Sequence, residues 1–159
     1  MLVTLTGRST VDPTSKDCCY LWELLTKSLF DLVAQGIIEE SAVDSFNIPH
    51  YNPCGEEIRE IVEMEGSFDV DKEDAFGICW DPDLGNDVGN NKDIIFDKYK
   101  SGQKVANCVR AFAESLLASH FGETIIDNLF TRYAHHMAEH LAIERTKFVT
   151  VLISMTRKY

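Results

Sequence analysis

The histidines near the end of the chain are the first residues whose spacing could support chemistry. His136 and His140 lie four residues apart, so a helix would bring both to one face, where they could share a metal ion. A zinc hydrolase of the H-E-x-x-H type needs a glutamate directly after the first histidine, whereas Met137 follows His136. We therefore predict that His135, His136 and His140 form a solvated helix face. His120 precedes a helix break and is predicted to be structural.

The five cysteines indicate neither a zinc knuckle nor a disulfide framework. Their number is odd, no C-x-x-C spacing occurs, and the only close pair is the adjacent Cys18-Cys19. No obvious general base flanks that pair, so we predict no nucleophilic role for it. Reduced thiols are typical of the cytoplasm, which is the expected location.

The charge balance limits the partners. The formal net charge is −11, from 26 acidic and 15 basic residues, and no basic cluster is present. Nucleic acid and anionic membranes are therefore not expected as partners, because both require clustered Lys and Arg. No apolar run approaches the roughly 18 residues of a membrane span. One acidic cluster is predicted to be a solvated helix face: Glu56, Glu57, Glu60, Glu63 and Glu65.

Hydrophobic patterning predicts one domain with three strands and a large excess of helix. Apolar β-prone residues begin and end the chain, and the glycine- and asparagine-rich stretch in its second half is typical of a loop. The expected segments are a strand at 1–8, a largely helical segment at 14–65, a strand at 67–80, a loop at 81–103, helices at 104–145 and a final strand at 146–157.

Several stretches, in order along the whole chain, resemble the plant SABATH family of S-adenosylmethionine (SAM)-dependent carboxyl methyltransferases. Any one of them is a weak signal, but the ordered set is specific. They are Leu2-Val3-Thr4-Leu5-Thr6-Gly7-Arg8, Cys18-Cys19-Tyr20-Leu21-Trp22-Glu23-Leu24-Leu25, Asp44-Ser45-Phe46-Asn47-Ile48-Pro49-His50-Tyr51, Glu65-Gly66-Ser67-Phe68, Val105-Ala106-Asn107-Cys108-Val109-Arg110-Ala111-Phe112-Ala113-Glu114, Ser119-His120-Phe121-Gly122-Glu123 and Lys147-Phe148.

The resemblance implies an α/β fold, the C-terminal part of a Rossmann-like methyltransferase with a helical cap. The three strands would pair in the order first, last, middle, which leaves the first strand with a bare edge. The donor-binding motifs of the family lie on earlier strands, so the SAM site is expected in a half that this chain lacks. Full-length members can form homodimers.

The resemblance also implies an acceptor pocket for a small-molecule carboxylic acid. Leu21 and Trp22 match pocket positions, and a flat indole suits an aromatic or alicyclic acid. The alternative is that Trp22, on an apolar helix, is buried in the protein core. The other matching positions are Tyr51, Val109, Phe112 and Phe148. Val109 and Phe112 share one helix face, where core packing is an equal alternative. Tyr51 could equally be a loop aromatic that packs on the domain.

A possible magnesium site follows from the same resemblance. Asp44, the Phe46 carbonyl and Asn47 offer hard oxygen ligands, which Mg²⁺ requires, and a further ligand would come from the missing half. Without the resemblance, this pattern is ordinary turn chemistry.

The expected function is SAM-dependent methyl transfer to a carboxylic acid of the jasmonate or salicylate type. Pro53-Cys54-Gly55-Glu56-Glu57 favours the jasmonate type, and Trp22 is unlike the purine-methylating members. We predict no catalytic acid or base, because a carboxylate with a pKa near 4 is already ionised at neutral pH. The alternative is a non-enzyme, an inactive fragment or an interaction module.

Overall fold

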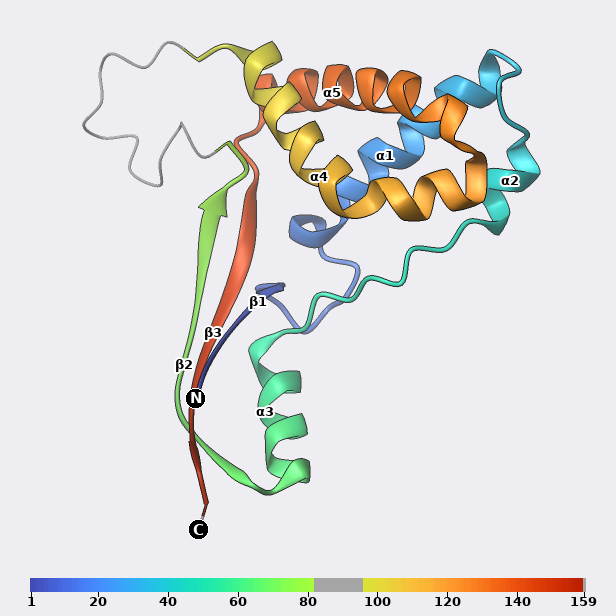
Figure 1. Ribbon diagram of the computed structural model, residues 1–159. Coiled ribbons are helices and arrows are strands. Elements are labelled where there is room, and N and C mark those ends of the chain that lie inside the picture. The colour runs from blue at the N-terminus through green and yellow to red at the C-terminus, as the bar shows by residue number, and fades with distance from the viewer. Residues whose placement is uncertain (82–95, 159) are drawn as a thin grey trace. The chain divides into compact units, whose positions relative to one another are not determined.

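In the computed structural model (Figure 1), which describes residues 1–81 and 96–158 and only the backbone at 16–18, the last strand lies between the other two. The strands are β1 (Leu2–Gly7), β2 (Phe68–Cys79) and β3 (Lys147–Arg157), in the order β1-β3-β2. β3 runs antiparallel to both neighbours, with Leu5 of β1 opposite Val151. The expected order of first, last and middle strand is therefore confirmed.

One face of this sheet is covered by helix α3 (Gly55–Glu65). Alternate residues of β3, Val151, Ile153 and Met155, are buried on that face, as the period of two in a strand requires. Ile58 and Val62, four residues apart on α3, pack against them. The sheet, α3 and the segments beside them form one compact unit, which we call the sheet unit: Met1–Tyr20, Pro49–Cys79 and Thr146–Tyr159.

The second compact unit is helical and comprises Leu21–Ile48 and Trp80–Arg145. It contains α1 (Lys16–Ala34) from Leu21 onward, α2 (Glu40–Ser45), α4 (Lys98–Phe121), the short 3-10 helix η2 (Glu123–Ile125) and α5 (Ile126–Ile143). The described residues of the expected single domain group into these two compact units. The core of the helical unit is made of apolar side chains from α1, α4 and α5: Leu25, Leu29, Leu32, Val105, Val109, Leu117, Leu129, Tyr133, Met137 and Leu141.

Helix α4 begins earlier than the sequence predicts. The Asp97 side chain accepts hydrogen bonds from the backbone N–H groups of Tyr99 and Lys100, which caps the helix at that point. The loop expected at 81–103 is therefore wrong for residues 98–103, and residues 82–95 lie outside the described residues. Gly102, which suggested a loop, lies inside the helix.

Gly102 is required by the packing of α4 on α5. A Cβ atom built at Gly102 would lie 2.5 Å from the Ala134 carbonyl oxygen and 2.7 Å from the Ala138 backbone nitrogen. Both are backbone atoms of α5, which cannot move aside as a flexible side chain can. Glycine is therefore the residue that allows the two helices to approach here.

We expect Gly102→Ala to lower the free energy of unfolding by about 1–3 kcal/mol, because the added methyl group overpacks the contact between α4 and α5. Urea denaturation followed by circular dichroism measures the change. Gln103→Ala, at an exposed neighbouring position of the same helix, is the control and should stay within about 0.5 kcal/mol of the parent. Equal stability of the two variants would contradict this account.

Candidate functional site

Two aromatic side chains that the sequence predicts to line an acceptor pocket contact each other in the helical unit. Trp22 of α1 and Phe112 of α4 contact each other edge to face, with ring centroids 6.0 Å apart and an interplanar angle of 81°. Trp22 is half-buried, whereas Phe112 is 58% exposed. The pair therefore presents aromatic surface that a flat apolar molecule could contact.

Leu21 precedes Trp22 on α1, and Val109 lies one helical turn before Phe112 on α4. Val109 is 1% exposed and belongs to the core of the helical unit. The Leu21 carbonyl accepts a hydrogen bond of 3.2 Å from the Tyr133 hydroxyl of α5, and burial raises the pKa of that hydroxyl. Tyr133 thus fixes the α1 backbone beside Trp22. Sequence reasoning missed this residue, since a core tyrosine has no distinctive local signal.

The turn after α2 is held by aromatic packing. The Phe46 ring lies against His120 and Phe121, at centroid distances of 5.1 and 5.0 Å. His120 Nε2 lies 2.9 Å from the Ala42 carbonyl oxygen, which can only accept, so the ring nitrogen donates this bond. The structural role predicted for His120 is confirmed. The Phe46 side chain anchors the turn and leaves Asp44 and Asn47 exposed on either side of it.

No metal centre is evident among the described residues. Within residues 1–81 and 96–158, no three His, Cys, Asp or Glu side chains group so that they could hold an ion. Asp44, the Phe46 carbonyl and Asn47 would together offer one carboxylate, one backbone oxygen and one amide.

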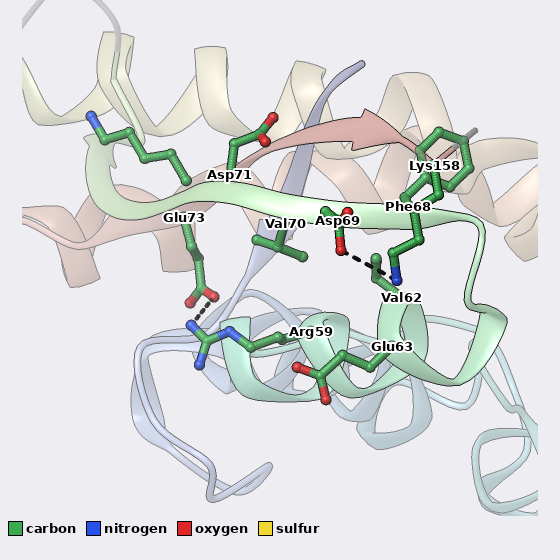
Figure 2. A pocket seen from close by; sticks show the side chains of 10 residues that line it. Arg59, Val62, Glu63, Phe68, Asp69, Val70, Asp71, Glu73 and Lys158 are labelled. Atoms are coloured by element: carbon green, nitrogen blue, oxygen red, sulfur yellow. Dashed lines mark hydrogen bonds and ion pairs between the residues drawn. The ribbon is translucent and has the colours of Figure 1, made fainter.

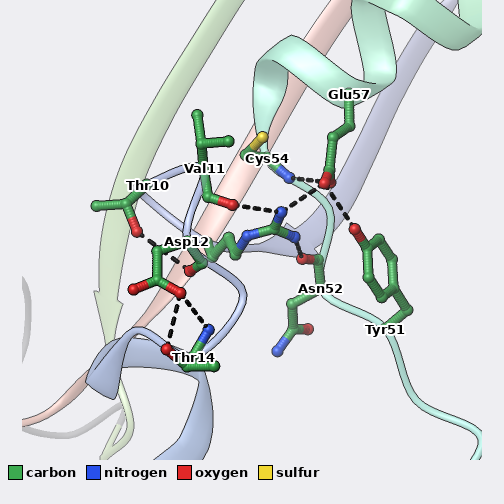
Figure 3. A network of polar contacts seen from close by, with 9 residues as sticks. Thr10, Val11, Asp12, Thr14, Tyr51, Asn52, Cys54 and Glu57 are labelled. Atoms are coloured by element: carbon green, nitrogen blue, oxygen red, sulfur yellow. Dashed lines mark hydrogen bonds and ion pairs between the residues drawn. The ribbon is translucent and has the colours of Figure 1, made fainter.

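In the sheet unit, a buried arginine and a glutamate contact the predicted pocket residue Tyr51 (Figure 3). Arg8 is 2% exposed, and its guanidinium donates to Glu57 Oε1 at 2.5 Å, to the Val11 carbonyl at 3.0 Å and to the Asn52 carbonyl. The Tyr51 hydroxyl donates to the same Glu57 oxygen at 2.7 Å, and the Arg8 guanidinium carbon lies 5.4 Å from the centre of the Tyr51 ring.

The Glu57 carboxylate accepts the hydrogen bonds of both Arg8 and Tyr51. Its Oε2 also accepts the backbone N–H of Cys54 at 3.1 Å, which completes the capping box of α3. The Arg8 hydrogen bond, with a further contribution from Tyr51, lowers the Glu57 pKa to about 2. The prediction of a solvated face for this cluster is therefore wrong for Glu57. The missed signal is the sequence Cys54-Gly55-Glu56-Glu57, whose last residue has the spacing of a capping box.

The remaining pocket match, Phe148, lies near the start of β3. It is half-buried and opposite Ile78 of β2. Tyr51 and Phe148 thus belong to the sheet unit, whereas Leu21, Trp22, Val109 and Phe112 belong to the helical unit.

The three histidines of α5 are not a simple solvated face. His136 Nε2 lies 2.6 Å from Asp31 Oδ2 of α1; the His136 side chain is 14% exposed and that of Asp31 37%. His140 packs on Trp80 at a centroid distance of 5.7 Å, and burial lowers its pKa. His135 alone is exposed, stacked on Tyr99. The prediction is wrong for His136 and His140, whose partners come from segments distant in the sequence.

Comparison with known proteins shows the family to which the chain belongs. A family model described as SAM-dependent carboxyl methyltransferase matches residues 1–158. The chain is 45% identical over 160 residues to the probable jasmonic acid carboxyl methyltransferase 1 of Theobroma cacao. It is 39% identical over 159 residues to the salicylate/benzoate carboxyl methyltransferase of Arabidopsis thaliana. Each match covers 99% of this chain but only 42% and 39%, respectively, of the relative.

The chain likewise covers less than half of a solved structure that it resembles. A loganic acid methyltransferase with SAH superposes with a TM-score of 0.74 at 29% identity, covering 100% of this chain and 42% of that one. The chain thus spans less than half the length of these relatives. The described residues contain no helix that is both long and apolar enough to cross a membrane.

We expect Glu57→Gln to destabilise the chain at neutral pH and to weaken its acid dependence. The Glu57 pKa falls from 4.5 to about 2 on folding, so its ion pair stabilises the fold fully above 4.5. That contribution disappears as the pH drops through about 2. Urea midpoints measured across this range should converge for the parent and the variant at low pH. Glu60→Gln, on the same helix, is the control; if it behaved like Glu57→Gln, the assignment would be wrong.

Proposed function

The chain belongs to the SAM-dependent carboxyl methyltransferase family, and we propose that it forms the acceptor-binding part of an enzyme that methylates the carboxylate of a small organic acid. The observation that carries the proposal is the edge-to-face pair of Trp22 and Phe112 at positions that resemble the acceptor pocket of the family. Relatives named for jasmonic, benzoic and salicylic acids support the substrate class.

Trp22 and Phe112 would hold the apolar body of the acid. Their perpendicular rings offer one face and one edge, an arrangement suited to a flat or alicyclic ligand. Leu21 would extend this surface, and Val109 would act by filling the core beneath it. Tyr51 and Phe148 remain proposed acceptor contacts on the strength of the resemblance. The Arg8–Glu57 pair would hold the Tyr51 hydroxyl in one orientation.

The proposed methyl transfer requires no general acid or base. SAM, when bound, supplies an electrophilic methyl group. The acid is already ionised at neutral pH, so the protein must strip water from the carboxylate and aim one oxygen at the methyl carbon. Apolar and aromatic side chains perform that work, which accounts for the proposed absence of a catalytic residue in this part of the enzyme.

The acid itself is proposed to be jasmonate-like. The stretch Pro53-Cys54-Gly55-Glu56-Glu57 resembles jasmonate-type members, and the cacao relatives with 45% and 42% identity carry jasmonic acid in their names. Salicylate is the alternative, since relatives at about the same identity are named for benzoic and salicylic acids.

We place the donor site outside this chain. The chain spans 42% of the cacao relative, and the sequence carries none of the acidic and glycine-rich donor motifs expected of the family. Alone, the chain would then bind an acid without methylating it. An interaction module without catalysis is the rival, and it predicts no acid binding at the aromatic pair.

Calorimetric titration of the purified chain with jasmonate and salicylate tests the proposal. We expect saturable binding of at least one acid, and Trp22→Ala should weaken it by about tenfold or more because the aromatic surface is lost. Phe30→Ala is the control, since Phe30 is a partly exposed aromatic on the same helix. SAM should not bind. Absence of acid binding, equal effects of the two substitutions, or saturable SAM binding would each contradict the proposal.

We also propose Asp44, the Phe46 carbonyl and Asn47 as a magnesium site completed by water and by groups outside this chain. The set fits Mg²⁺ in kind, because all three ligands are oxygens and the carboxylate is exposed. The ion would brace the turn that Phe46 anchors rather than take part in the reaction.

The magnesium site predicts that Asp44→Ala abolishes Mg²⁺ binding in a calorimetric titration, since it removes the only charged ligand. Glu40→Ala removes a carboxylate from the same helix and should leave binding unchanged. Similar losses in both variants would indicate diffuse attraction to an acidic chain instead of a site.

A further inference from the structure

The two rings of the proposed acceptor site lie on different helices, Trp22 on α1 and Phe112 on α4, so their contact depends on how these helices are held. We propose that α5, which carries none of the predicted pocket residues, is the template that sets both helices, and that Tyr133 is the positioning residue for Trp22. The inference rests on the proposed function for the identity of the ligand. It assigns Tyr133 no contact with the acid itself.

Tyr133 holds the peptide group that carries Trp22. Its hydroxyl donates to the Leu21 carbonyl at 3.2 Å, and this carbonyl belongs to the peptide bond between Leu21 and Trp22. A carbonyl oxygen has two lone pairs, of which an α-helix uses one, so the second is available to a donor from another helix. Because the peptide group is planar, fixing its oxygen also restricts the Cα atom of Trp22. The direction in which the indole leaves α1 therefore depends on Tyr133.

The Tyr133 hydroxyl is itself held in place. The residue is 0% exposed, and the Phe130 ring packs on it edge to face at a centroid distance of 6.1 Å. Burial raises the pKa of the hydroxyl, so the group stays protonated and keeps its proton for the Leu21 carbonyl. A buried hydroxyl that lost its acceptor would carry a desolvation cost, which favours the geometry in which the bond is made.

Two further contacts hold the other end of α1 on α5. The Arg132 guanidinium donates to the Gln35 side-chain oxygen at 2.6 Å, and His136 Nε2 lies 2.6 Å from Asp31 Oδ2. Leu21 and Gln35 lie about 21 Å apart along α1, from a rise of about 1.5 Å per residue, whereas their partners on α5 are neighbours in sequence. Helix α1 thus crosses α5 and is held on both sides of the crossing, which restricts its sliding and its rotation.

The same part of α5 holds α4. Ala134 follows Tyr133, and a Cβ atom built at Gly102 of α4 would lie 2.5 Å from the Ala134 carbonyl oxygen and 2.7 Å from the Ala138 backbone nitrogen. The backbones of α4 and α5 are therefore in close contact at this point. Consecutive residues of α5 thus reach the two helices that carry the aromatic pair, and the relative position of the two rings follows from α5.

Fluorine NMR tests the positioning without any ligand. The chain contains two tryptophans, Trp22 and Trp80, so incorporation of 5-fluorotryptophan gives two signals, which Trp22→Phe assigns. Tyr133→Phe removes only the hydroxyl and keeps the ring in the core. We expect it to shift or broaden the Trp22 signal and to leave the Trp80 signal in place, which shows that the fold is retained. A Trp22 signal that stays in place, or equal changes in both signals, would overturn the proposal.

Acid binding gives a second readout. In a calorimetric titration with jasmonate or salicylate, Tyr133→Phe should weaken binding by about three- to tenfold, the contribution of one hydrogen bond expressed as a ratio of dissociation constants. Gln35→Ala is the matched control, because it removes a hydrogen bond between the same two helices. The contact of Asp31 with His136 still holds that end of α1, so the affinity should stay within about twofold of the parent.

A second control lies in the sheet unit. Arg59 of α3 pairs with Glu73 of β2 at 2.5 Å (Figure 2), and Arg59→Gln breaks this ion pair in the other compact unit. It should leave the affinity for the acid within about twofold of the parent, because a small loss of stability there does not move Trp22. An equal loss of affinity in Tyr133→Phe and Arg59→Gln would mean that Tyr133 acts through stability alone and would refute its positioning role.

A double-mutant cycle shows whether Tyr133 acts through Trp22. If it does, Tyr133→Phe should weaken acid binding no further in a chain that already carries Trp22→Ala. Additive effects of the two substitutions would contradict the assignment, because the hydroxyl would then act on the site by another route. If the parent chain bound no acid, the proposed function would fail, while the fluorine signals would still decide whether Tyr133 sets the position of Trp22.

Discussion

The pairing of β3 with both other strands is the constraint on which the sheet unit depends. Residues from the first ten positions of the chain and from the last fourteen lie side by side, with Leu2 opposite Ser154. Closing the long loops between these segments costs conformational entropy before the contacts between the strands can form. The cost is offset where Val151, Ile153 and Met155 become buried beneath α3. In the sequence, the two segments of the helical unit, Leu21–Ile48 and Trp80–Arg145, are inserted between segments of the sheet unit.

The Arg8–Glu57 ion pair connects that sheet to its helix. Arg8 follows β1 directly and is buried, so its charge must be matched, and Glu57 in the first turn of α3 supplies the carboxylate. A buried ion pair is not in itself strong stabilisation, because both charges lose water. Its value lies in geometry: the same carboxylate caps α3 and receives the Tyr51 hydroxyl. One interaction therefore sets the helix start and the direction of a proposed pocket side chain.

The two outer strands of the sheet differ in their side chains. β2 carries the charges and the bulge of a strand that faces water, while β1 carries neither. The helical unit, in contrast, has its own apolar core and its own tight helix contact at Gly102.

How far the sequence determines this protein depends on whether a feature is local or spread along the chain. Period-two apolar residues and the ordered family motifs determined the three strands, their order, the family and the candidate residues Trp22 and Phe112. Composition and turn residues could not distinguish Gly102 in a loop from Gly102 in a helix. The need for glycine there comes from the α5 backbone at Ala134 and Ala138, which lie far along the chain. Glu57 and His136 looked like members of solvated faces for the same reason, since their partners Arg8 and Asp31 lie far off in the sequence. Sequence alone therefore determined the family and the elements, through local periodicity and motif order. Only the tertiary structure decided which charges are buried and which glycine is obligatory, because each depends on atoms brought together by folding.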